Sequence, residues 1–280
     1  MAKKRPRART IVMTNQKGGV AKSTTAEAFS ASLHDRGYRT LMVDLDSQPG
    51  NLSLHVGADK DAPGVYELLN ARVPSEENAL RCIQDADSFG SVMAANEDLD
   101  LLDDKLSQRN THEFILSRML APILRHFDFI ILDTPPAFQL RTKNAIVAAD
   151  DIIIPSMAET SSLVGVGELI DRIHELRQDV IDTTDRARRH DMRVRGVLIT
   201  MYESTNNLMP ARLDKFKHDF VEGRGIPMFQ PPIRRTISVQ YTQASRDSLV
   251  RLHSNSTAAR DYEEVVSSYL SSVGHATQPE

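Results

Sequence analysis

The sequence predicts an α/β fold in which a doubly wound, mostly parallel sheet carries helices on both faces. Three observations support this prediction. Short apolar runs alternate with helical patterns along the 280 residues. Two runs, 127–133 and 151–155, are almost continuously apolar, as expected of parallel strands covered on both faces. A glycine-rich segment joins the first run to the first helical pattern, which is typical of a phosphate-binding site.

The expected elements follow in order along the chain. Strands are expected at 10–14, 40–44, 91–95, 99–102, 127–133, 151–155, 194–201 and 226–229. The first helix is expected at 22–36, where Gly37 ends it. Apolar residues that recur at intervals of three and four predict a long amphipathic helix around 163–176.

The organisation predicts a single domain, because the chain shows no low-complexity linker and no internal repeat. We expect one domain at 10–270, preceded by a basic flexible arm at 1–9 and followed by a loose tail at 271–280. The arm either touches the phosphate backbone of a nucleic acid or is a solvated tail. Its positive charge comes from Lys3, Lys4, Arg5, Arg7 and Arg9.

The composition excludes several classes of protein. A hydrophobic share of 40% argues against disorder. No run approaches the roughly 18 apolar residues of a membrane helix, and no signal peptide opens the chain, so we expect a cytoplasmic protein. The one cysteine, Cys82, cannot form an internal disulfide. The histidines lie too far apart in sequence to suggest a histidine-built metal site.

The segment 15–25 carries the strongest functional signal. Two glycines let the backbone wrap closely around a phosphate chain, Lys22 supplies charge for the β- and γ-phosphates, and Ser23 can ligate Mg²⁺. The strict P-loop pattern fails because Gln16 and Ala21 occupy its glycine positions. We expect a backbone conformation at Ala21 that a Cβ tolerates. The predicted ATP-binding residues are Lys17, Gly18, Gly19, Val20, Ala21, Lys22, Ser23 and Thr24.

This loop resembles the deviant Walker A loop of the ParA/MinD ATPases, and the preceding Asn15-Gln16 looks like its ParA/Soj branch. The resemblance implies ATP and Mg²⁺ as cofactors and a homodimer that forms with ATP. It also implies that Lys17, the signature lysine of the superfamily, reaches across to the partner's nucleotide. Lys17 and Lys22 would both be catalytic.

Two later segments fall where this resemblance requires them. Residues 43–51 are similar to the family's VDLDPQGN segment, although Ser47 and an extra Pro49 disturb the spacing. The resemblance implies that Asp46 positions the attacking water and that Asp44 supports the Mg²⁺ surroundings. The run 127–133 looks like the Walker B strand, so Asp133 would hold Mg²⁺ together with Ser23. Residues 134–136 would then move with the γ-phosphate.

The leading interpretation is a ParA-like ATPase that binds DNA non-specifically and drives plasmid or chromosome partitioning. The resemblance implies a ParB-like centromere-binding partner and association with the nucleoid. Arg234 and Arg235 lie in a segment loosely similar to a DNA-contacting segment of the family, so they are either DNA contacts or plain surface arginines.

Three alternatives compete with this interpretation. A MinD-like ATPase that cycles on membranes needs a basic amphipathic C-terminal helix, but residues 258–273 carry three acids and one arginine, so we expect no stable membrane association. An Fe–S carrier needs paired cysteines, which Cys82 alone cannot supply. A nucleotide switch with little hydrolysis remains open because of Ala21 and the altered segment 47–49.

Overall fold

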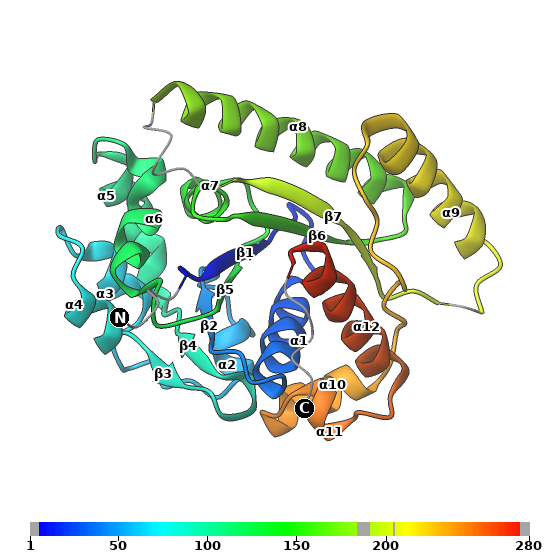
Figure 1. Cartoon of the computed structure of the whole chain (residues 1–280), viewed down its shortest axis with the longest axis horizontal. Coiled ribbons are helices and arrows are strands. Elements are labelled where there is room, and N and C mark those ends of the chain that lie inside the picture. Colours follow the sequence, from blue (N-terminus) through cyan, green and yellow to red (C-terminus); the bar gives the residue numbers. More distant parts are fainter. Residues whose placement is uncertain (1–5, 184–190, 204, 275–280) are drawn as a thin grey trace.

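The computed structural model describes residues 6–183, 191–203 and 205–274. Its strands form one sheet in the order β3-β4-β2-β5-β1-β6-β7 (Figure 1). β3 is antiparallel to β4, and every other neighbouring pair is parallel. The predicted fold class is therefore confirmed. The strands are β1 (Arg9–Met13), β2 (Thr40–Asp44), β3 (Gln84–Asp85), β4 (Ser91–Met93), β5 (Phe129–Asp133), β6 (Asp151–Met157) and β7 (Arg193–Thr200).

Helices cover both faces of the sheet and enclose a separate apolar core on each (Figure 1). One face carries α1 (Lys22–Asp35), α2 (Leu52–His55), α10 (Ser238–Ser245), α11 (Leu249–Leu252) and α12 (Thr257–Ser272). The other carries α3 (Val65–Asn70), α4 (Glu76–Arg81), α5 (Leu102–Ser107), α6 (Ile115–Leu120), α7 (Leu140–Val147), α8 (Thr160–Thr183) and α9 (Met209–Phe216). A π-helix, Lys217–Glu222, continues α9. The short 3₁₀ turns are Asp87–Phe89, Glu97–Leu101, His112–Phe114 and Ala121–Ile123.

The strand sequence explains why both faces are covered. In β1, Ile11 and Met13 pack into the core beneath α1 and α12, whereas Val12 between them packs into the opposite core. Successive side chains of a strand point to opposite faces, so an all-apolar strand needs helices on both sides. The predicted long amphipathic helix is α8, whose apolar stripe faces the core shared with α7.

The register of the central strands brings their carboxyl ends level with one another. Asp133 at the end of β5 pairs with Met13 of β1 on one side and with Asp44 of β2 on the other. The loop that follows β1 and the acids that end β2 and β5 therefore meet at one edge of the sheet. This edge is where open α/β sheets bind ligands.

A buried ionic cluster ties the opposite edge of the sheet together. Asp151, fully buried at the start of β6, accepts hydrogen bonds from Arg9 of β1, Arg195 of β7 and Tyr269 of α12. A buried carboxylate is costly unless it is paired in this way. Arg7 of the predicted basic arm makes two hydrogen bonds to Asp150, at 3.0 and 2.7 Å. Residues 1–5, which carry the rest of the arm's charge, lie outside the described residues.

Two predicted strands are wrong. Residues 99–102 fall in the 3₁₀ turn Glu97–Leu101 and at the start of α5, because the buried Leu99 and Leu102 are three positions apart and share one helical face. Residues 226–229 make only an isolated parallel bridge between Met228 and Val197 of β7. Pro227 has no N–H to donate to a longer ladder. Within the described part of the chain, no helix is long and apolar enough to cross a membrane.

Candidate nucleotide-binding site

Asn15 orders the start of the glycine-rich loop. This buried residue donates from its side-chain nitrogen to the carbonyl oxygen of Pro155 at 2.7 Å, and its side-chain oxygen accepts from the backbone N–H of Lys17 at 3.0 Å. Farther along the loop, Thr200 of β7 donates its hydroxyl to the carbonyl oxygen of Val20 at 3.1 Å. Polar groups of β6 and β7 thus hold the loop against the sheet.

The loop passes into α1 through two residues with left-handed backbone. Gly19 has φ 70° and Ala21 has φ 61°. Ala21, with ψ 37°, lies in the small left-handed region that L-residues can occupy at some cost, so the loop keeps a glycine-like turn that a Cβ tolerates. Ala21 also offers no side-chain cap to α1. The first N–H groups of that helix remain available to an anion.

Three acidic residues face the start of α1. Asp44 and Asp133 are fully buried at the ends of their strands, and Asp46 lies two residues beyond Asp44. Burial raises the pKa of the Asp44 carboxyl to about 6 and the pKa of the Asp133 carboxyl well above its usual range, with the charge of Asp44 adding to the second shift. Buried, unneutralised carboxylates of this kind are suited to a divalent cation.

The two buried acids differ in their partners. Asp44 accepts hydrogen bonds from the backbone N–H and hydroxyl of Ser53, at 2.8 and 2.5 Å. Neither carboxylate oxygen of Asp133 accepts a hydrogen bond of ordinary geometry from the described residues. Ser23 nevertheless lies close enough to lower the pKa of Asp133 in part. Because buried polar atoms are almost always satisfied, the two oxygens of Asp133 fit a bound cation.

Lys22 supplies the positive charge of the site. Its side chain is largely buried at the start of α1. Burial lowers the pKa of the Lys22 ammonium, and the carboxylates of Asp133 and Asp46 oppose this shift. The structure thus brings together the predicted residues Lys22, Asp46 and Asp133.

Lys17 points elsewhere. Its ammonium group pairs with Glu159, just before α8, at 2.6 Å, and lies 3.2 Å from the hydroxyl of Ser162. The Lys17 side chain is 37% exposed and that of Glu159 is 43% exposed, so the pair lies at the molecular surface. The two lysines of the loop therefore lie in different environments. Lys22 lies among the buried carboxylates, whereas Lys17 lies on the outer side of the loop.

The residues present fit a nucleoside triphosphate with Mg²⁺. The unsatisfied oxygens of Asp133 suit the cation, and Ser23 provides a hydroxyl at the first turn of α1. The uncapped helix start and Lys22 suit the phosphates. A cavity of about 410 Å³ adjoins this place and is lined by Asp46, Ser47, Gln48, Asp100, Asp103, Pro135, Pro136, Ala137, Gln139 and Arg141.

Arg234 and Arg235 lie apart from this site and differ from each other. Arg234 forms a forked pair with the buried Asp261 of α12, with bonds of 2.9 and 2.6 Å. Arg235 is 67% exposed and makes a single 2.7 Å ion pair with Glu203. The Arg234 guanidinium thus holds its loop against α12, whereas that of Arg235 lies on the surface.

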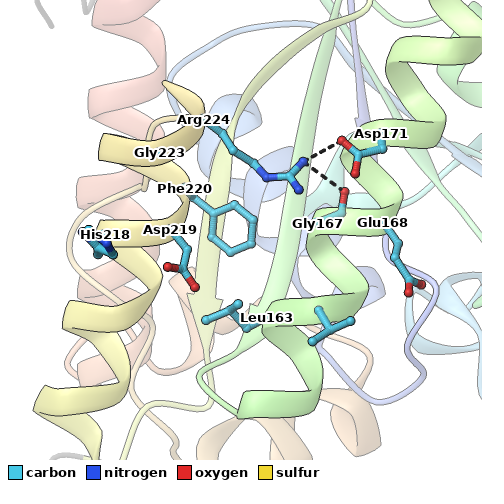
Figure 2. A pocket seen from close by; sticks show the side chains of 10 residues that line it. Leu163, Gly167, Glu168, Asp171, His218, Asp219, Phe220, Gly223 and Arg224 are labelled. Atoms are coloured by element: carbon cyan, nitrogen blue, oxygen red, sulfur yellow. Dashed lines mark hydrogen bonds and ion pairs between the residues drawn. The ribbon is translucent and has the colours of Figure 1, made fainter.

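A second hollow of about 490 Å³ lies between α8 and the π-helix, away from the phosphate loop (Figure 2). Arg224 crosses it to reach Asp171 at 2.6 Å and the carbonyl oxygen of Gly167 at 3.5 Å. Leu163 and Phe220 supply its apolar wall. None of its lining residues belongs to the predicted site.

Sequence analysis missed several residues around the site. Ser53 holds Asp44, Glu159 holds Lys17, and Arg141 reaches the loop that carries Asp46. Arg141 lies in an ordinary helical pattern, and Glu159 is one acid among many. Only Ser53, close behind the acidic segment, lies near enough in sequence to have been suspected.

Comparisons with known proteins agree with this geometry. Residues 8–185 match the model of a family described as an AAA domain. The chain is 36% identical over 207 residues to the chromosome partitioning protein ParA of Myxococcus xanthus, which covers 71% of this chain and 67% of that protein. It is 30% identical over 261 residues to the sporulation initiation inhibitor protein Soj of Bacillus subtilis, which covers 86% of this chain and 94% of that protein.

Solved structures show the same fold. Cobyrinic acid a,c-diamide synthase from Mycobacterium smegmatis, with bound ADP and magnesium, is 30% identical with a TM-score of 0.76, covering 97% of this chain and 98% of that one. A McdA variant from Cyanothece in complex with ATP is 20% identical with a TM-score of 0.79, covering 98% and 99%. At 20% identity the second likeness shows the fold alone. With the phosphate loop and acids described above, the family match and the relatives show that the chain belongs to the ParA/Soj-type ATPases.

Proposed function

We propose that this chain is a ParA-type ATPase that forms a homodimer with ATP, binds DNA without sequence preference, and drives plasmid or chromosome partitioning by cycles of hydrolysis. Its partner would be a ParB-like centromere-binding protein, and it would reside in the cytoplasm on the nucleoid. The observation that carries the proposal is the separation of Lys17 from Lys22. Lys22 lies among Asp133 and Asp46, whereas Lys17 lies at the molecular surface, paired with Glu159.

The proposed roles follow from these positions. Lys22 and the backbone of residues 17–24 hold the phosphates, and Ser23, Asp44 and Asp133 hold or support the cation. Mg²⁺, when bound, neutralises charge on the phosphates and orients them. Asp46 orients the attacking water, and Lys17 of one subunit stabilises the charge that develops at the other subunit's nucleotide. A cation delivered in trans contributes about 10³–10⁵ in rate in related phosphoryl-transfer enzymes.

A MinD-like ATPase that cycles on membranes has less support. Such a protein needs an amphipathic helix with a free apolar face. In α12 the apolar residues Tyr262, Val266 and Tyr269 are buried against α1 and the sheet. Flotation with anionic vesicles in the presence of ATP tests this alternative, because a MinD-like protein would rise with the vesicles.

A nucleotide switch with little hydrolysis is the second alternative, and the altered segment 47–49 motivates it. Single-turnover phosphate release with ATP and DNA decides the question. A ParA-type ATPase releases phosphate and retains ADP, whereas a switch keeps ATP intact.

Substitution of Arg235 gives the sharpest test of the proposed DNA binding. With ATP present, affinity for duplex DNA should fall steeply with salt and should not depend on sequence, because phosphate contacts dominate. Arg235→Ala should weaken binding and reduce the salt slope by about one. The exposed Arg72, in the loop after α3, gives a matched control, so Arg72→Ala should leave both unchanged. Unchanged binding by Arg235→Ala would remove this residue from the DNA surface.

A further inference from the structure

Arg141 is a buried arginine beside the loop that carries Asp46. It lies in the first turn of α7, five residues after Pro136, and its side chain is only 5% exposed. One nitrogen donates to the carbonyl oxygen of Leu45 at 3.0 Å and to the hydroxyl of Ser47 at 3.3 Å. These two bonds hold the residues immediately before and after Asp46.

The other nitrogens of Arg141 bind acids of the 97–107 segment. Nη2 donates to Asp100 at 2.6 Å, and Nε donates to both oxygens of Asp103 at 3.1 Å. Ser47 closes the network by donating its hydroxyl to the same oxygen of Asp100 at 2.5 Å. A buried guanidinium needs such partners to offset its desolvation. Its fork therefore joins α7, the Asp46 loop and the 97–107 segment in fixed geometry.

We propose that Arg141 is a positioning residue for hydrolysis, which holds Asp46 at the phosphate loop by fixing the backbone before it and the side chain after it. The inference rests on the proposed role of Asp46. It also accounts for Ser47, which stands where the family's VDLDPQGN segment has proline. The serine hydroxyl bonds to Arg141 and Asp100, which a proline cannot do.

The bonds of Asp46 itself show why outside support matters. Its carboxylate accepts the backbone N–H of Gln48 at 3.1 Å, and its carbonyl oxygen accepts from the side chain of Asn51 at 2.7 Å. These contacts lie within five residues. The sheet itself holds only the start of the loop, where the backbone N–H of Leu45 donates to the carbonyl oxygen of Asp133 and that of Asp46 donates to the carboxylate of Asp44, each at 3.0 Å. The Arg141 bonds span 94 and 96 residues of sequence. They anchor the loop to α7, which begins four residues after 134–136, the segment expected to move with the γ-phosphate.

A lysine cannot replace this arginine. Its single ammonium group lacks the planar fork that reaches the Leu45 carbonyl, the Ser47 hydroxyl and two carboxylates at once. Arg141→Lys keeps the charge that the two acids require and removes the geometry. Ser47→Ala is a milder change at a half-buried position, and it removes only the hydroxyl link. Asp98→Asn is the matched control, because Asp98 is an exposed acid in the same turn as Asp100 and takes no part in the described hydrogen bonds of the network.

The experiment combines two measurements on the full chain. Amide hydrogen exchange without nucleotide reports the order of residues 45–48, and steady-state kinetics report kcat and KM for ATP. Arg141→Lys and Ser47→Ala should each speed exchange at residues 46–48. They should lower kcat by about tenfold for the lysine variant and less for the alanine variant, with KM within about twofold. The double variant should be no slower than Arg141→Lys alone, because both changes break one network.

Two results would overturn the inference. Exchange at residues 46–48 that matches the Asp98→Asn control would show that Arg141 does not hold the loop. Faster exchange with wild-type kcat would show that the bonds from Arg141 to the Asp46 loop have no role in hydrolysis. Failure of the proposed function looks different, because the wild-type chain itself would then release no phosphate, or Asp46→Ala would hydrolyse ATP at the wild-type rate.

Discussion

At the residue scale, the phosphate loop keeps a strained backbone at a position where the sequence lacks glycine. Ala21 has φ 61° and ψ 37°, in the left-handed region that an alanine occupies at a cost of roughly 1–2 kcal/mol. Its carbonyl accepts both the backbone N–H and the hydroxyl of Thr25, at 3.0 and 2.6 Å. These bonds belong to the first turn of α1, so the helix start helps hold the alanine in place.

Ala21→Gly should therefore stabilise the protein. Relief of the left-handed strain outweighs the extra freedom of glycine in the unfolded chain, which costs about 0.4–1 kcal/mol. We expect a net gain of about 0.5–1 kcal/mol in the free energy of unfolding, measured by urea denaturation without nucleotide. Ala28→Gly, inside α1 where backbone is regular, should instead destabilise by about 1 kcal/mol or more. A loss of stability in Ala21→Gly would contradict the strain at this position.

The unsatisfied carboxylate of Asp133 makes a second prediction, with a definite pH dependence. In the folded protein the pKa of Asp44 is raised to about 6 and the pKa of Asp133 is raised well above its usual range, chiefly by burial. The folded state therefore binds more protons than the unfolded state, in which both pKa values lie near 3.9. Without Mg²⁺ and nucleotide, stability should fall as pH rises from about 4 through 6 and beyond.

Asp133→Asn removes one of these two charges. At pH 7.5 and without ligands, the variant should be more stable than the wild type by about 1–2 kcal/mol, and its stability should decline less with pH. Mg²⁺-dependent nucleotide binding should be lost. Thermal melting between pH 5 and 8 measures the first effect. Asp98→Asn, at the surface, should leave the pH profile unchanged, and a less stable Asp133→Asn would contradict the account.

At the scale of elements, the sequence predicts those helices, strands and loops that depend on residues close together along the chain. The strands β1, β2, β5 and β6 were predictable because each is a mostly apolar run that is almost wholly buried, and β7 because its second half is such a run. The phosphate loop was predictable because its chemistry lies in one segment. The error at 99–102 arose because four residues with leucine at both ends suit a strand or a helix turn equally. The segment forms helical turns because Leu99 and Leu102, three positions apart, are both buried, and burial depends on the tertiary fold.

The site residues that the sequence did not predict make contacts between elements that lie far apart along the chain. Arg141 meets Leu45 across 96 residues, and Glu159 meets Lys17 across 142. No spacing rule connects such positions within one sequence. The three acids were found because each ends or closely follows a strand, whereas their supporting side chains come from helices packed nearby.

The junction between β6 and α8 carries a prediction of its own. Glu159 and Ser162 hold Lys17 within its own subunit, so a lysine that acts across the dimer must first leave them. An exposed ion pair contributes about 0.2–1 kcal/mol, and two are broken per dimer. Glu159→Gln should therefore strengthen ATP-dependent dimerisation by about threefold or more, measured by sedimentation of the Asp46→Ala protein. Glu168→Gln, farther along α8, is the control. Weaker dimers in Glu159→Gln would show that Glu159 serves the dimer instead.

At the scale of the whole molecule, the fold divides the site between the sheet and the loops that follow its strands. The phosphate loop, β2 and β5 are anchored by the sheet and by two buried cores. The Asp46 loop follows β2 and residues 134–136 follow β5, and Arg141 joins the Asp46 loop to α7 and to Asp100. Lys17 lies beyond both, at the surface. This layout suits a protein whose chemistry is completed by a second copy of itself.

The mass of the protein in solution with ATP and Mg²⁺ tests that central claim most directly. In light scattering, Asp46→Ala should have twice the 31.3 kDa monomer mass, because ATP is bound and not hydrolysed. Adding Lys17→Ala should return it to the monomer mass while ATP still binds, and adding Lys60→Ala, an exposed lysine beyond α2, should not. A full dimer of the Asp46→Ala/Lys17→Ala protein would contradict the role of Lys17 across the subunit boundary.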